Sequence, residues 1–110
     1  MAATSNQSGS TMMEVQETLA RIRSHKTVEA ACILTKEGGI IHSTWTEEQT
    51  NTHSPLLTLL TKQATDLVKH MDENDELTVL RVHSKHKEIM ISAEKDYILI
   101  VLSKPRRLDE

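Results

Sequence analysis

One short segment constrains the fold more than any other: residues 97–102 (YILIVL) form an unbroken apolar run. Successive side chains of a strand point to opposite faces, so a strand that is apolar throughout must be covered on both sides. The run is far too short to cross a bilayer, which requires about 20 apolar residues. It therefore predicts a central strand in a sheet that has other structure packed on both faces.

Four more segments have the composition of strands: residues 28–34, 40–45, 77–84 and 88–92. The first two flank a turn containing Gly38 and Gly39, which predicts a hairpin with both glycines at positive φ. The short polar links at 85–87 and 93–96 require antiparallel neighbours. Residues 77–84 are half polar and β-branched, and this favours an edge position that another chain could pair with.

Two segments have helical periodicity. In the first, Met12, Val15, Leu19 and Ile22 lie on one face, and Ser10 or Thr11 could cap it. The second is predicted to start at Pro55, which suits a first helical turn, and to end between residues 72 and 76. Its apolar side is wider than one sheet face needs, so a second helix, from the same or another chain, could cover the surplus. That side contains Leu56, Leu57, Leu60, Ala64, Leu67, Val68 and Met71.

These elements give the order α-β-β-α-β-β-β and an α/β (α+β) domain with a five-stranded antiparallel sheet. The 110 residues suffice for one domain. We expect it to span residues 13–104, between a disordered tail at 1–12 and a short tail at 105–110. Trp45 and Tyr97 are the two aromatic residues, so the core is aliphatic and thin, and a partner or homodimer is expected.

Composition excludes several functions. The net charge of −3 and the shortage of rings argue against nucleic-acid binding, and no segment predicts a membrane span or a signal peptide. A single cysteine cannot form an internal disulfide, which favours a reduced, cytosolic setting.

No enzyme, metal or cofactor site is predicted. The six histidines have no metal-ligand spacing. Cys32 lies in an apolar strand, where a thiol behaves as a small buried hydrophobe. The turn at residues 37–39 lacks the lysine and following helix of a phosphate loop. Trp45 is predicted to pack at the rim of the core, with an interface anchor as the alternative.

The stretch 81–87 is locally basic. Such a stretch is often only a solvated surface, but it could also contact an acidic partner segment. Lys85 and Lys87 are the candidate residues for that contact.

The order and content of several segments resemble roadblock-type dynein light chains. Residues 74–91 (NDELTVLRVHSKHKEIMI) follow the family's signature, and residues 95–101 (KDYILIV) match its Lys-Asp-Tyr and aliphatic run. Residues 14–19 match its start, and Glu37-Gly38 with Ser43-Thr44 match its first hairpin. Val79 stands where the family usually has Phe, and His86 where it usually has a second Lys.

The resemblance implies a roadblock/profilin-like domain and a homodimer, or a heterodimer with a sister roadblock chain. In it, the third strands pair edge to edge and the long helices meet. It also implies a non-catalytic light chain that binds the dynein intermediate chain and links the motor to cargo or assembly. The location would be cytoplasmic and associated with the microtubule cytoskeleton, or axonemal. The alternative is a roadblock-domain scaffold or regulator of a small GTPase, a role that relatives of the fold, including bacterial ones, perform.

On this basis we expect two groups of residues to mediate self-association. The strand edge contributes Leu77, Val79, Arg81 and His83, and the long helix contributes Leu57, Ala64 and Val68.

Overall fold

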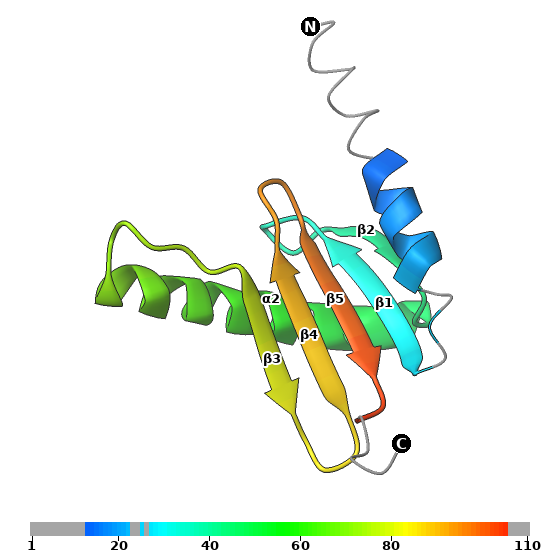
Figure 1. The fold of residues 1–110 in the computed structure, drawn as a ribbon. Helices are drawn as coiled ribbons and strands as arrows, with labels where there is room; N and C mark the ends of the chain where they lie inside the picture. The colour runs from blue at the N-terminus through cyan, green and yellow to red at the C-terminus, as the bar shows by residue number, and fades with distance from the viewer. Residues whose placement is uncertain (1–12, 23–24, 26, 106–110) are drawn as a thin grey trace, which may run out of the picture.

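The computed structural model describes residues 13–22, 25 and 27–105. After an N-terminal helix over residues 13–22, the chain forms two strands, a long helix and three more strands (Figure 1). In order these are β1 (Val28–Leu34), β2 (Ile40–Ser43), α2 (Glu47–Met71), β3 (Val79–His83), β4 (Glu88–Ala93) and β5 (Ile98–Ser103). The α/β class and the predicted element order are confirmed.

The five strands form one antiparallel sheet in the order β2-β1-β5-β4-β3. The apolar strand β5 lies at the centre, paired with β1 on one side and β4 on the other. Its residues Ile98 to Val101 are all buried, as continuous apolarity predicts. Strand β3 lies at an edge, which was also predicted.

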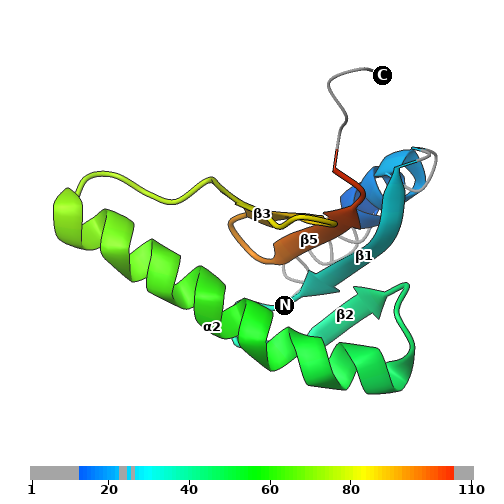
Figure 2. The same ribbon diagram turned by 90° about the horizontal axis from the view of Figure 1, so that it is seen from below.

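Two layers of helix cover the sheet, one on each face (Figures 1 and 2). The N-terminal helix buries Val15 and Leu19 against Ala31, Ile33, Leu99 and Val101. On the other face, Leu57 of α2 packs with Cys32, Leu34, Ile91, Ile98 and Ile100. Alternate residues of β1 and β5 thus serve two separate apolar clusters, which explains why these strands have no polar face.

Helix α2 begins at Glu47, eight residues before the predicted start at Pro55. Thr46 caps it: its hydroxyl accepts a hydrogen bond from the Gln49 N–H, and the Gln49 side chain accepts one from the Thr46 N–H. Pro55 lies inside the helix rather than in its first turn. Polar composition in residues 47–54 concealed this first part, although the capping box marks it. The predicted end is confirmed, because Asp72 is the C-cap.

The strand ends differ in detail from the sequence predictions. Only Gly38 of the two turn glycines has a positive φ, of 101°. Strand β2 ends at Ser43, two residues before the predicted end. The Trp45 N–H donates a hydrogen bond to Ser43 Oγ in the short link between β2 and α2. Strand β3 begins at Val79, so Leu77 precedes it.

Several sequence predictions concern residues that the structure does not describe. These are the helix caps Ser10 and Thr11, Met12 of the first helix, the tail at residues 1–12, and the tail at 105–110 apart from Pro105. Within the described part of the chain, no helix is long and apolar enough to span a bilayer.

Candidate self-association and docking surface

Within the described part of the chain, alternate residues along the outer edge of β3 have backbone groups with no strand partner. On its inner side, Ser84 N–H donates to Lys87 C=O and Ala93 N–H donates to Thr78 C=O. In an antiparallel pair this pattern repeats every second residue, so the even-numbered residues of β3 bond to β4. The odd-numbered residues Val79, Arg81 and His83 therefore direct their N–H and C=O groups away from the sheet. This edge is a template for another strand.

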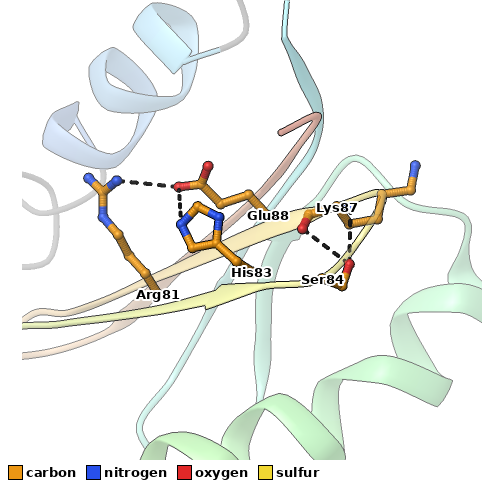
Figure 3. Close-up of polar contacts among 5 residues, drawn as sticks. All are labelled: Arg81, His83, Ser84, Lys87 and Glu88. Carbon is orange, nitrogen blue, oxygen red and sulfur yellow. Dashed lines mark hydrogen bonds and ion pairs between the residues drawn. The ribbon is translucent and has the colours of Figure 1, made fainter. Parts of the chain in front are cut away.

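The side chains of Arg81 and His83 meet Glu88 on the neighbouring strand β4 (Figure 3). Arg81 Nη1 donates to Glu88 Oε1 at 3.3 Å, and His83 Nε2 lies 3.8 Å from the same oxygen. The carboxylate is mostly buried, whereas Arg81 and His83 are largely exposed. Glu88 therefore draws the Arg81 cation toward β4, away from the open edge.

The turn between β3 and β4 carries the two lysines predicted to bind a partner. Ser84 and Lys87 close it, since the Ser84 hydroxyl accepts from the Lys87 N–H and donates to the Lys87 C=O (Figure 3). Lys85 is exposed. Lys87 forms an ion pair with Glu29 of β1, so part of its charge is already compensated within the chain. Lys85 is thus the better candidate of the two for an external acidic group.

One flank of α2 carries an exposed apolar stripe of Leu56, Leu60, Leu67 and Met71. Their exposed fractions are 64, 37, 59 and 78%. The helix continues past the β3 edge, so its last turns project beyond the sheet (Figures 1 and 2). Large apolar residues grouped in this way mark an interaction surface.

The three helix residues predicted for self-association lie in different environments. Leu57 is 8% exposed and packs into its own core, so it is not on the surface that a second chain could contact. Ala64 and Val68 are half-buried. The spacing of the apolar residues correctly identified the helix, but it could not show which of them the sheet would cover.

An apolar hollow of about 320 Å³ borders the stripe, between α2 and the sheet. Leu56 and Leu60 form one wall, and Ile89 and Leu102 lie on the other side. Trp45 closes one end, with its ring centroid 5.0 Å from that of His53. Trp45 is half-buried and packs against the core, in agreement with the rim position predicted for it.

The described residues show no cluster for metal binding, and Cys32 is poorly placed to act as a nucleophile. They contain no group of three or more His, Cys, Asp or Glu side chains able to hold a metal ion. Cys32 is fully buried, and burial raises the pKa of its thiol, an effect that a hydrogen bond with Ser43 partly offsets. A protonated, inaccessible thiol is a poor nucleophile.

A family model agrees with this architecture: the Roadblock/LC7 domain matches residues 14–104. The chain belongs to the Roadblock/LC7 domain family. The predicted membership of a roadblock family is thereby confirmed.

Three of the solved structures that share the fold come from Streptomyces, Myxococcus and Thermus. The Roadblock/LC7 domain from Streptomyces avermitilis has a TM-score of 0.69 at 12% identity, covering 76% of this chain and 71% of that one. MglB from Myxococcus xanthus has a TM-score of 0.65 at 15% identity, and the match covers 74% of this chain and 69% of that one. The gliding protein MglB from Thermus thermophilus has a TM-score of 0.62 at 15% identity, and the match covers 84% of this chain and 70% of that one. At these identities the likeness concerns the fold.

Proposed function

We propose that this Roadblock/LC7 protein is a non-catalytic scaffold subunit that dimerises and, as a dimer, binds a segment of another protein. The observation that carries the proposal is the coincidence of two unpartnered features on one side of the domain. The last turns of α2, which end at the exposed Met71, run past the open β3 edge (Figure 2), so a chain paired with that edge would lie beside the end of the stripe. A second copy would satisfy both at once.

The β3 edge is suited to pairing with itself. Strand β3 has five residues and Arg81 is its midpoint. If two copies pair antiparallel about this residue, Val79 of one chain lies opposite His83 of the other. The facing pairs are then Val79 with His83, Arg81 with Arg81, and His83 with Val79. Each of these residues directs its backbone N–H and C=O outward, so each pair can exchange two hydrogen bonds.

The stripe on α2 has a matching symmetry. Leu60 and Leu67 lie four and three residues from Ala64, and Leu56 and Met71 lie eight and seven residues from it. Antiparallel helices that cross at Ala64 would place Leu60 against Leu67 and Leu56 against Met71 of the second copy. A small residue at the crossing point lets two helices approach closely. Isologous contact of this kind is what a two-fold dimer requires.

Two partners are candidates for such a dimer. The motif at residues 74–91 resembles dynein light chains and supports an intermediate-chain segment as the partner, in a cytoplasmic or axonemal motor complex. The bacterial structures that share the fold, including a gliding protein, support the scaffold or regulator of a small GTPase at least as well. Both candidates require a protein-binding module rather than an enzyme.

Sedimentation equilibrium at micromolar concentration tests the dimer. We expect twice the monomer mass for the wild-type chain, and monomer for Val79→Pro, which removes an outward N–H without breaking the β3–β4 ladder. Val79→Ala keeps that N–H and is the matched control. A wild-type monomer would refute the dimer, and a fully dimeric Val79→Pro would refute the strand pairing.

Affinity capture of the tagged chain followed by mass spectrometry tests the partner. An intermediate chain among the captured proteins supports the motor function, whereas a small GTPase without it supports the alternative. Capture of neither contradicts both partner assignments.

A further inference from the structure

A second hollow, of about 800 Å³, lies on the other flank of α2. The turn between β1 and β2 forms one wall with Lys36 and Gly38, and α2 forms the other with Leu59 and Lys62. Ile98, the first residue of β5, also lines it. We call this hollow the turn groove.

The turn groove is separate from the proposed dimer surface. Successive residues of a helix are rotated by about 100°. The buried side of α2, which includes Leu57 and Thr61, therefore has the apolar stripe on one flank and Thr58 with Lys62 on the other, while Leu59 lies on the outward face at the rim of the groove. A dimer built on the stripe leaves the turn groove open to a different molecule.

The walls of the turn groove combine an apolar surface with excess positive charge. Leu59 is 52% exposed and lines the groove together with Pro55 and the buried Ile98. The charged residues that line the groove are two cations, Lys36 and Lys62, and one anion, Glu37. The two cations come from opposite walls, so a ligand lying between them would meet both.

The turn wall is held in place before any ligand arrives. Thr35 N–H donates to Gly39 C=O, Gly38 N–H donates to Thr35 C=O, and Gly39 N–H donates to the Thr35 hydroxyl. Gly38 adopts a φ of 101°, and a Cβ there would lie 3.2 Å from Thr58 Oγ1 on α2. The turn thus packs directly on the helix, and a preformed wall reduces the ordering that binding requires.

We propose that the turn groove binds an acidic segment of a partner protein. An aliphatic side chain of the segment would lie against Leu59 and Ile98, while its carboxylates would contact Lys36 and Lys62. The inference rests on the proposed function as a protein-binding scaffold, but it does not depend on the dimer. It adds a binding site that lies away from the β3 edge.

NMR titration of the full chain tests the turn groove. The probe is an acetylated eight-residue peptide of Asp and Glu with two central Leu residues, and the control peptide has Lys in place of the acids. We expect saturable amide shifts at Gly38, Leu59 and Lys62 with the acidic peptide only. In Lys62→Glu and in Leu59→Ser we expect the dissociation constant to rise at least tenfold, whereas Lys104→Glu, which lies beyond β5, leaves it unchanged.

The inference is overturned if millimolar acidic peptide causes no shifts in the groove, if the Lys peptide shifts the same amides, or if Lys104→Glu weakens binding as much as Lys62→Glu. Sedimentation of the same samples separates this result from the dimer. Groove shifts in a monomeric chain would support the turn groove while refuting the dimer.

Discussion

The two halves of the sheet differ sharply in how they are covered. Strands β1 and β5 lie between two helical layers, and Ile33 and Ile100 are almost completely buried. At the other side, Val79 of β3 is 46% exposed and Met71 at the end of α2 is 78% exposed. The covered half contains the apolar contacts that stabilise one chain. The open half leaves comparable apolar groups exposed, and it is this exposure that supports the proposed association.

Truncation of a core residue should have the largest effect on this contrast. Ile33→Ala removes a fully buried side chain from the cluster under the N-terminal helix. We expect a loss of about 2–5 kcal/mol in the free energy of unfolding, measured by urea denaturation. Val79→Ala, in a strand of the open half, should lower the stability of the isolated chain by less than about 0.5 kcal/mol. If Ile33→Ala and Val79→Ala lowered the free energy of unfolding equally, the covered and open halves would not differ in their contribution to stability.

A charge on the stripe should affect association rather than folding. Leu67→Asp places a carboxylate at the centre of the proposed helix contact, opposite Leu60 of the second copy. We expect the dimer dissociation constant to rise about 100-fold, or about 2.7 kcal/mol, as measured by sedimentation. The melting temperature at dilutions where both proteins are monomeric should hardly change. Asp66→Asn, one residue earlier but off the stripe, is the control, and an equal effect there would contradict the contact.

Loss of the Glu88 charge should weaken the dimer more modestly. In the proposed register the two Arg81 residues lie opposite one another, and like charges in facing positions repel. Glu88 compensates each of them through its 3.3 Å contact. Glu88→Gln should raise the dissociation constant about tenfold at low salt and less at high salt, because salt screens the repulsion. The exposed Glu76→Gln is the control, and a salt-independent effect would argue against this role.

The smallest expected effect is on the pH dependence of the free energy of unfolding, and it comes from the buried thiol of Cys32 in the covered half. Burial raises the pKa of Cys32, so the folded chain retains this proton to a higher pH than the unfolded chain does. The stability that this group contributes is complete below the pKa of the unfolded thiol and declines as the pH rises above it. Urea midpoints between pH 7.5 and 10 should fall more steeply for the wild type than for Cys32→Ala. Parallel pH profiles would show that the thiol does not contribute.

Much of the fold was predictable because, in both halves of the sheet, the local sequence pattern agrees with the position of the strand in the sheet. The apolarity of residues 97–102 placed β5 at the centre, and the polar alternation of residues 77–84 placed β3 at an edge. The start of α2 was missed because residues 47–54 are polar, yet Thr50 and Ser54 are buried there. The Thr50 hydroxyl donates to the helix carbonyl of Thr46, which lets a polar residue face the sheet.

The candidate surface was less predictable. The choice of Val79, Arg81 and His83 rests on the expected edge position of β3 and on the family resemblance, and their role in self-association stays a prediction. Leu57 was selected for its apolarity, but only the angle at which α2 crosses the sheet decides that Leu57 points inward. The turn groove depends on the close approach of Gly38 to Thr58. These residues are 20 positions apart in the sequence, so no local sequence pattern predicts the contact.

The pairing of β1 with β5 has a consequence for biosynthesis. Val28 lies opposite Ser103, so the first strand meets one of its two neighbours only when the last strand has been made. At a synthesis rate of about 5–20 residues per second, that wait lasts on the order of 4–15 s. During this interval the nascent chain carries β1, whose residues from Ala30 to Leu34 are apolar, with one side unpaired. The synthesis of β5 therefore completes the sheet, and premature termination within β5 would leave a chain without its central strand.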